Sequence, residues 1–188
     1  MTANPTLVRL QQLLPELFQP VEVTGDRYLR FQLTTDLPAL LSMDRVQEAL
    51  LVSASAISPL PNLPDFTIGM MNARDRVFCV VDLGQLLGLP SLLPNLQTYQ
   101  VVVISLDPVQ TEEIDLAGLS AVKCLGLAVR QIKGVGRFES ETLQPPSEEF
   151  PECLTPYQSG YFDTTERILV LDIAAIATTP ALFENPFL

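Results

Sequence analysis

The feature that most constrains this chain is a series of short apolar segments, several with a period of two, separated by turns. In 27–35, RYLRFQLTT, the apolar residues Leu29, Phe31 and Leu33 alternate with polar and aromatic ones. Alternation of this kind indicates a β-strand with one buried face. The residues expected to face solvent are Tyr28, Arg30, Gln32 and Thr34.

Further strand candidates follow along the chain, and few helical patterns separate them. LPALLSM and RVQEALLV, which come next, predict a three-stranded meander together with 27–35. An α/β nucleotide-binding fold needs helices between parallel strands, and the sequence lacks them. We therefore predict an all-β protein built from two small barrels of similar design. The remaining strand candidates are 76–81, 98–106, 123–138 and a hairpin within 159–171.

A local repeat supports the similarity of the two halves. VVDLGQLLG (80–88) and LVLDIAAIA (169–177) each place an aspartate between an apolar strand and a short helical pattern. An aspartate at this position accepts hydrogen bonds from the free N–H groups of the helix, so Asp82 and Asp172 are predicted N-caps. A catalytic pair of carboxylates is the alternative interpretation of the same residues.

The first residues, outside the strand region, predict an amphipathic helix over 5–18 with leucines at helical spacing. This helix would serve either as a lid on the core or as a docking element for a partner. We divide the chain into 1–26 (helix and linker), 27–178 (one domain of two barrels) and 179–188 (tail).

The charge of the chain limits its partners. Its 22 acidic residues outnumber 11 basic ones, for a formal net charge of −11. Such a field repels phosphate backbones and anionic lipid surfaces, so we expect no nucleic acid and no direct membrane contact. Because no segment resembles a secretion signal or a bilayer span, we expect a cytoplasmic protein.

Side chains for catalysis are scarce. The chain has no histidine, so neither a Ser-His-Asp nor a Cys-His arrangement can form. We expect no enzymatic activity, no cofactor and no metal. The remaining enzymatic alternative is a small hydrolase that uses Asp82 or Asp163 with Glu166 as an acid–base pair.

The cysteines are too far apart in sequence for a zinc site or a redox dithiol. We expect buried, reduced thiols. The three residues are Cys79, Cys124 and Cys153.

The central stretch GMMNARDRVFCVVDL (69–83) carries a family resemblance, together with YLRFQL, DRVQEAL, GLAVRQIKGVGRF, LQPP and RILVLDIAAI. In this order the segments resemble the CheW-like domain, the adaptor of bacterial chemotaxis arrays, over about Arg27 to Ile176. Three positions depart from the family pattern: Asp75 replaces a glycine, Cys79 a proline and Arg130 an aspartate. The residues that match the central pattern are Gly69, Asn72, Arg74, Asp82 and Leu83.

The resemblance implies two five-stranded barrels side by side and a non-enzymatic role. Family members bind the regulatory domain of a CheA-like histidine kinase through the barrel ends. They bind the cytoplasmic tip of a methyl-accepting receptor in the groove between the barrels, so the membrane is reached only through the receptor. The implied receptor-side residues are Val46, Glu48, Asn72 and Arg74.

Two questions stay open at this point. Arg74 suits recognition of the receptor, but its five donors also suit a purely architectural role, tying the barrels together through carbonyl groups. The amino-terminal helix, the CVVDL strand and the insert 107–122 resemble CheW-like proteins that steer pilus-driven phototaxis in photosynthetic bacteria. The alternative is a stand-alone regulator that binds a response regulator or a motor component.

Overall fold

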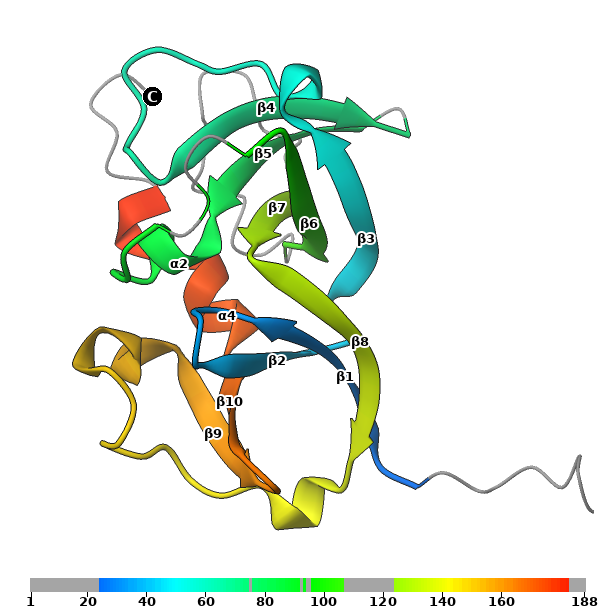
Figure 1. Ribbon diagram of the computed structural model, residues 1–188, viewed down its shortest axis with the longest axis vertical. Coiled ribbons are helices and arrows are strands. Elements are labelled where there is room, and N and C mark those ends of the chain that lie inside the picture. The colour runs from blue at the N-terminus through cyan, green and yellow to red at the C-terminus, as the bar shows by residue number, and fades with distance from the viewer. Residues whose placement is uncertain (1–23, 75, 92, 94–95, 107–123, 183–188) are drawn as a thin grey trace, which may run out of the picture.

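The computed structural model describes residues 24–74, 76–91, 93, 96–106 and 124–182 (Figure 1). The predicted helix over 5–18 and the insert 107–122 lie outside these residues. None of the described helices is long and apolar enough to cross a membrane.

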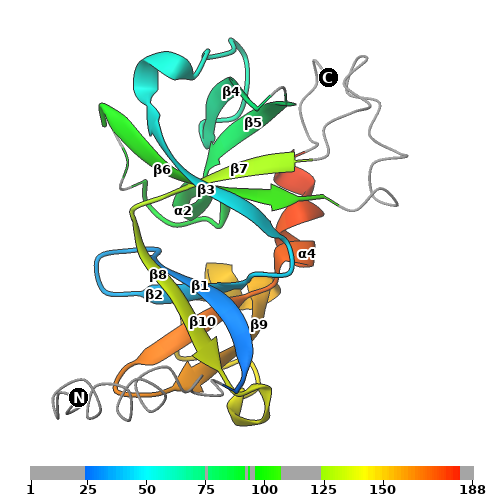
Figure 2. The ribbon, with the colours of Figure 1, turned by 90° about the vertical axis from the view of Figure 1, so that its right-hand side faces the viewer.

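Within the described residues, ten strands form two five-stranded sheets, which follow one another along the long axis of the molecule (Figures 1 and 2). This arrangement confirms the predicted all-β class with two five-stranded units. Sheet A has the order β8 (Gln131–Phe138), β1 (Asp26–Gln32), β2 (Pro38–Ser42), β10 (Arg167–Leu171), β9 (Gln158–Asp163). Sheet B has the order β3 (Val46–Ser53), β6 (Thr98–Ser105), β7 (Cys124–Val129), β5 (Arg76–Asp82), β4 (Thr67–Ala73).

Short helices connect the strands. The described helices are α2 (Leu83–Leu86), α4 (Ile173–Ala177) and the 3-10 turns η1 (Ala54–Ala56), η2 (Ser140–Thr142), η3 (Glu152–Tyr157) and η4 (Pro180–Leu182). Both α-helices lie near the junction of the two sheets (Figure 1).

The predicted three-stranded meander is wrong. Strand β2 pairs with β1, but β3 leaves for the other sheet and pairs with β6. The segment 123–138 likewise divides at Arg130 into β7 of sheet B and β8 of sheet A. Periodicity predicted where strands occur, but the choice of partner strand depends on contacts far apart in sequence.

The two sheets share one plan in permuted order. In sheet B the strands β3 to β7 follow one another along the chain, whereas sheet A uses β8, β9 and β10 and then β1 and β2. Each sheet contains one parallel pairing, β5 with β7 and β10 with β2. Sheet A is therefore completed by segments from the two ends of the described chain.

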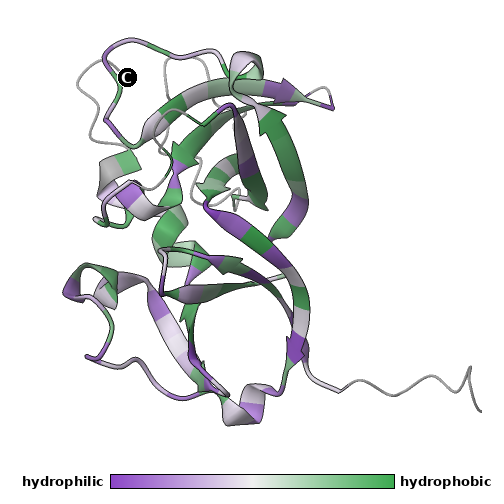
Figure 3. Ribbon diagram, in the orientation of Figure 1, coloured by the Kyte–Doolittle hydropathy of each residue, from purple (hydrophilic) through white to green (hydrophobic). Residues whose placement is uncertain are grey.

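The largest hydrophobic cluster lies between the sheets and contains side chains from both, with apolar colouring concentrated on the strands (Figure 3). Strand β1 contributes Leu29 and Phe31, and strands β5 and β7 contribute Val81 and Leu127. Each sheet also encloses a smaller cluster of its own. The central strand β7 is thus buried along its whole length, whereas the edge strands β3 and β8 each keep one exposed face.

Tyr28, expected to face solvent, is buried instead, at 8% exposure. Its ring contacts Phe138 and Phe162 edge to face, with centroids 5.8 and 5.6 Å away. Phe138 and Phe162 stack at 4.8 Å. The two faces of β1 therefore line two different parts of the core. Leu29 and Phe31 face the core between the sheets, and Tyr28 faces the interior of sheet A. Such aromatic pairs add about 0.5–1.5 kcal/mol each beyond burial.

The predicted N-caps are confirmed. Asp82 accepts a hydrogen bond from the Gln85 amide at 3.2 Å. Asp172 accepts from the amides of Ala174 and Ala175 at 2.8 and 3.2 Å. Both aspartates therefore start short helices at the same point of their sheets.

Candidate functional site

The hairpin of β4 and β5 ends in a tight turn that carries Arg74. Pairing between the strands extends to Ala73 opposite Arg76, which leaves a two-residue connection. Arg74 has a φ of 47°, in the left-handed region that side chains with a Cβ adopt rarely. Two-residue hairpin turns favour positive φ because their twist then matches that of the strands. Arg74 takes this conformation next to Asp75, the residue that replaces the family glycine.

Glu48 of β3 reaches the base of this turn. Its side chain is only 9% exposed, and its Oε2 lies 3.3 Å from Nε of Arg74. Its Oε1 accepts a hydrogen bond from Nη2 of Arg76 at 3.1 Å. A carboxylate this buried needs compensating charge, and the two arginines supply it.

The two arginines differ in how much of each guanidinium is used. Arg76 is 40% exposed and also donates to Oε1 of Gln47. Its Nη1 lies 3.6 Å from Sγ of Cys124, whose thiol donates to Gln47 at 3.3 Å. Arg76 thus joins β5 to β3 and β7. Arg74 is 76% exposed and contacts Glu48 through Nε, so the outer part of its guanidinium faces solvent.

The structure brings together only part of the predicted receptor-side set. Glu48 and Arg74 are in contact, and exposed Asn72 lies on β4 close to the turn. Val46, in contrast, is half-buried and packs against the shared core between the sheets. Within the described residues, Arg74 makes its recorded contact inside sheet B and none that ties the sheets together through carbonyl groups.

Sequence reasoning missed the roles of Gln47 and Arg76. Both positions were visible, since Arg76 stands two residues after Arg74 and Gln47 precedes Glu48. Their convergence was not, because 29 positions separate them in the chain. The sequence did contain one indication, the charge of Glu48 in an otherwise half-apolar strand. A carboxylate there requires a cationic partner once it is buried.

The carboxylates proposed for hydrolysis each have a structural partner. Asp82 is 4% exposed, caps α2 and accepts from the Ser91 hydroxyl, beside a cavity of only about 10 Å³. Asp163 and Glu166 lie on the β9–β10 hairpin of the other sheet, where arginines engage both. In the part of the chain that the structure describes, no group of His, Cys, Asp or Glu could hold a metal ion.

Comparisons with known proteins agree with this architecture. The family model described as the CheW-like domain matches residues 27–181. The crystal structure of the scaffolding protein TtCheW from Thermoanaerobacter tengcongensis is similar over 81% of this chain and 92% of that chain, with a TM-score of 0.64. Sequence identity in that comparison is 17%, so the likeness establishes the fold. The search of curated proteins gave no match.

Proposed function

Since this chain belongs to the CheW-like domain family, whose members are scaffolding adaptors of chemotaxis signalling and not enzymes, we propose that it couples a methyl-accepting receptor to a CheA-like histidine kinase. Family membership confirms the predicted absence of enzymatic activity. In this proposal the regulatory domain of the kinase is the part that binds, and it binds at the barrel ends. The protein acts in the cytoplasm and meets the membrane only through the receptor.

The receptor side of this proposal rests on one observation: Arg74 and Arg76 both contact Glu48, but only Arg74 is largely exposed. Its buried carboxylate accepts a hydrogen bond from Nη2 of Arg76 through Oε1, and Oε2, which has no hydrogen-bond partner among the described residues, forms an ion pair with Nε of Arg74. The remaining donors of Arg74 point outward, and an arginine fork of this kind suits a carboxylate on the receptor tip. Glu48 therefore acts as a positioning residue, and Arg74 and Asn72 make contact with the receptor helix. Val46, which lies on the same strand as Glu48 and packs against the core between the sheets, completes the receptor side of the proposal.

Binding assays with a charge-reversed variant test this proposal. We expect Arg74→Glu to weaken binding of the receptor tip at least about tenfold, because it places a carboxylate where a cation is needed. The matched control is Arg167→Glu at the hairpin of sheet A, which should bind the receptor tip like wild type. Arg167 also pairs with carboxylates, and its side chain is 43% exposed. Equal receptor binding by wild type and Arg74→Glu would contradict the assigned surface.

The kinase side is tested separately by size-exclusion chromatography with the regulatory domain of the kinase encoded nearest to this chain. Wild type and Arg74→Glu should both co-migrate with it, and this result would place Arg74 away from the kinase contact. Failure of both forms to co-migrate at concentrations well above micromolar would favour the stand-alone regulator.

The narrower proposal is that the receptor is a photoreceptor and the output is pilus-driven twitching motility. It rests on the sequence resemblance to phototaxis adaptors. Deletion of the gene should then abolish directed movement toward light and leave pili assembled. The stand-alone alternative keeps support from Arg130, an exposed residue at the β7–β8 junction where the family pattern has an aspartate.

A further inference from the structure

Strand β3 contains one extra residue, Gln47, at the point where it reaches the β4–β5 tip. The pairing of β3 with β6 shifts register between Val46 and Glu48, which leaves Gln47 as the residue of a β-bulge. Consecutive residues of a regular strand point to opposite faces, and a bulge re-aims them. Here Arg76 reaches the side chains of both Gln47 and Glu48. The bulge therefore lets two neighbouring residues bind one guanidinium.

Arg76 divides its guanidinium between these two residues. Its Nη1 donates to Oε1 of Gln47, and its Nη2 donates to Oε1 of Glu48 at 3.1 Å. Because a guanidinium is planar and rigid, fixing one of its amino groups restricts the position of the other. Gln47 therefore helps to determine where Arg76 holds the carboxylate of Glu48.

A buried thiol in turn holds the amide of Gln47. Cys124, the first residue of β7, is 4% exposed, and its Sγ donates to Oε1 of Gln47 at 3.3 Å. The same Sγ lies 3.6 Å from Nη1 of Arg76. Since the thiol and the guanidinium both donate, they require the oxygen of the Gln47 amide, rather than its NH₂ group, to point toward them.

The position of Arg74 depends on this arrangement through Glu48. Oε2 of Glu48 lies 3.3 Å from Nε of Arg74, but it has no hydrogen-bond partner among the described residues. Charge attraction is less directional than a hydrogen bond. The ion pair therefore draws Arg74 toward the carboxylate, and the place of that carboxylate is set by its hydrogen bond to Arg76.

We propose that Gln47 and Cys124 are positioning residues of the receptor surface, which act through Arg76 and Glu48 to orient the guanidinium of Arg74. This inference rests on the receptor role proposed for Arg74. Two other roles for Gln47 give different experimental results: direct contact with the receptor from its exposed position, and a purely structural role in the bulge.

A double-mutant cycle distinguishes positioning from direct contact. The probe is the isolated cytoplasmic tip of the methyl-accepting receptor encoded nearest to this chain, titrated into the full chain. Gln47→Met keeps the length of the side chain but removes its acceptor, and it should weaken binding about fivefold. In an Arg74→Ala background the same substitution should change affinity by less than about 1.5-fold, because the residue through which Gln47 acts is gone. Equal weakening in both backgrounds would show direct contact and overturn the proposal.

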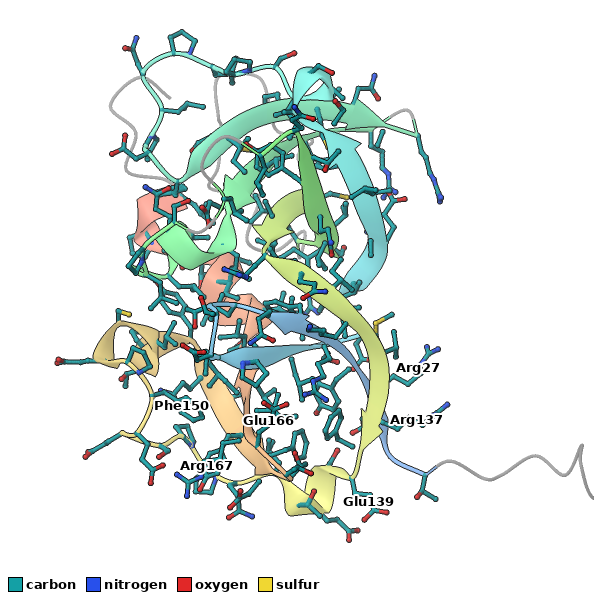
Figure 4. The ribbon with its side chains drawn as sticks, viewed as in Figure 1. Arg27, Arg137, Glu139, Phe150, Glu166 and Arg167 are labelled. Atoms are coloured by element: carbon teal, nitrogen blue, oxygen red, sulfur yellow. The ribbon has the colours of Figure 1, made fainter. Side chains whose placement is uncertain are left out.

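Arg76→Lys tests the guanidinium itself. It keeps the charge, but one ammonium group cannot hold both acceptors in a fixed geometry, so binding should again weaken about fivefold. The matched control is Arg167→Lys, since Arg167 also contacts two carboxylates. Figure 4 shows Arg167 with Phe150 and Glu166 in the sheet A half of the molecule. This control should bind the tip like wild type, and equal weakening by both lysine variants would contradict the proposal.

The thiol is tested by a conservative pair of variants. Cys124→Ala removes the donor to Gln47 and should weaken binding of the tip about twofold, whereas Cys124→Ser retains a donor and should bind like wild type. Equal affinities of these two variants would remove Cys124 from the proposed set.

Nuclear magnetic resonance of the protein alone separates this inference from the receptor assignment. The Nε–H signal of Arg74, identified by its loss in Arg74→Lys, should shift in Gln47→Met and in Arg76→Lys and stay in place in Arg167→Lys. The melting temperature of Gln47→Met should stay within about 2 °C of wild type. An unmoved signal in Gln47→Met, with or without a lower melting temperature, would overturn the positioning role. Wild-type receptor binding by Arg74→Ala would instead refute the receptor surface, and the Arg74 signal would then decide the positioning role by itself.

Discussion

Sheets A and B share their strand arrangement and a close contact between a loop and a strand backbone, but their exposed side chains differ. Gly69 of β4 and Gly160 of β9 have φ values of 149° and 150°. A Cβ on either would lie 2.3 Å from the Ser58 carbonyl oxygen or 2.2 Å from that of Gln144. Each glycine adjoins an isolated bridge from a proline-containing loop, Ser58 to Met70 and Gln144 to Tyr161. The repeated glycine therefore reflects the same close approach of loop and strand.

The hairpin tips show the opposite tendency. At the β4–β5 tip, Arg74 and Arg76 surround a buried carboxylate and leave a cation outside. At the β9–β10 tip, exposed Glu166 pairs with Arg30 of β1, and exposed Asp163 pairs with Arg167 of the same hairpin. A groove of about 390 Å³ beside the β9–β10 tip is lined by both acidic and basic side chains. The two tips therefore differ in the arrangement of their charges, whereas the framework beneath them is repeated.

The largest expected effect tests the shared framework. Gly69→Ala and Gly160→Ala should each lower the free energy of unfolding by about 2–4 kcal/mol, because the new methyl group meets a backbone carbonyl. Gly134→Ala is the matched control: its φ is also positive, at 123°, but its Cβ would meet nothing within 4 Å. It should cost only about 1 kcal/mol. Urea denaturation measures all three, and a Gly69 cost no larger than the control would refute the close approach.

The two N-caps should differ by less. Asp82→Ala should cost about 2 kcal/mol, since Asp82 is buried and also accepts from the Ser91 hydroxyl. Asp172→Ala should cost about 1 kcal/mol, the usual value for an N-cap. Asp82→Asn and Asp172→Asn retain an acceptor and should recover most of the loss. Thermal melts of the four variants give the ranking, and equal costs would mean that Ser91 contributes nothing.

Local and non-local information explain why some of these features could be predicted and others could not. Asp82 and Asp172 were predictable because a cap depends on three or four neighbouring residues. The burial of Tyr28 was not, since it requires knowing that Phe138 and Phe162 close the other face of β1. Alternation shows that a strand has two different faces. It does not say whether the second face meets water or another part of the core.

The candidate site follows the same division. The family resemblance placed Glu48 and Arg74 on one surface, and the structure brings them to 3.3 Å. It could not assign the carboxylate to a positioning role, because that conclusion depends on the second arginine, Arg76, and on the 9% exposure of Glu48. Val46 was assigned to the same surface, although it is half-buried and packs against the core between the sheets.

Stability measurements should separate the two arginines of the β4–β5 tip. Arg76→Ala should destabilise the protein by about 1 kcal/mol, because it removes one of the two cations that compensate a buried carboxylate. Arg74→Ala should change stability by less than about 0.5 kcal/mol, since that side chain is 76% exposed. Denaturant midpoints test this order. A larger loss for Arg74→Ala would assign it an architectural role and leave receptor recognition without its main residue.

The smallest effect concerns thiol reactivity, where no change in stability is involved. The prediction that all three cysteines are buried is wrong for Cys153, which is exposed, whereas Cys124 is buried and Cys79 is partly covered. Burial raises the pKa of the Cys79 thiol from 9.0 to about 11, since desolvation disfavours the thiolate. At pH 8 the thiolate fraction of Cys79 is therefore lower by about a hundredfold. Iodoacetamide should label Cys153 first in native protein, and Cys153→Ser should abolish the fast phase. Comparable labelling of Cys79 in that variant would show that sheet B opens at β5 far more readily than its packing against the shared core implies.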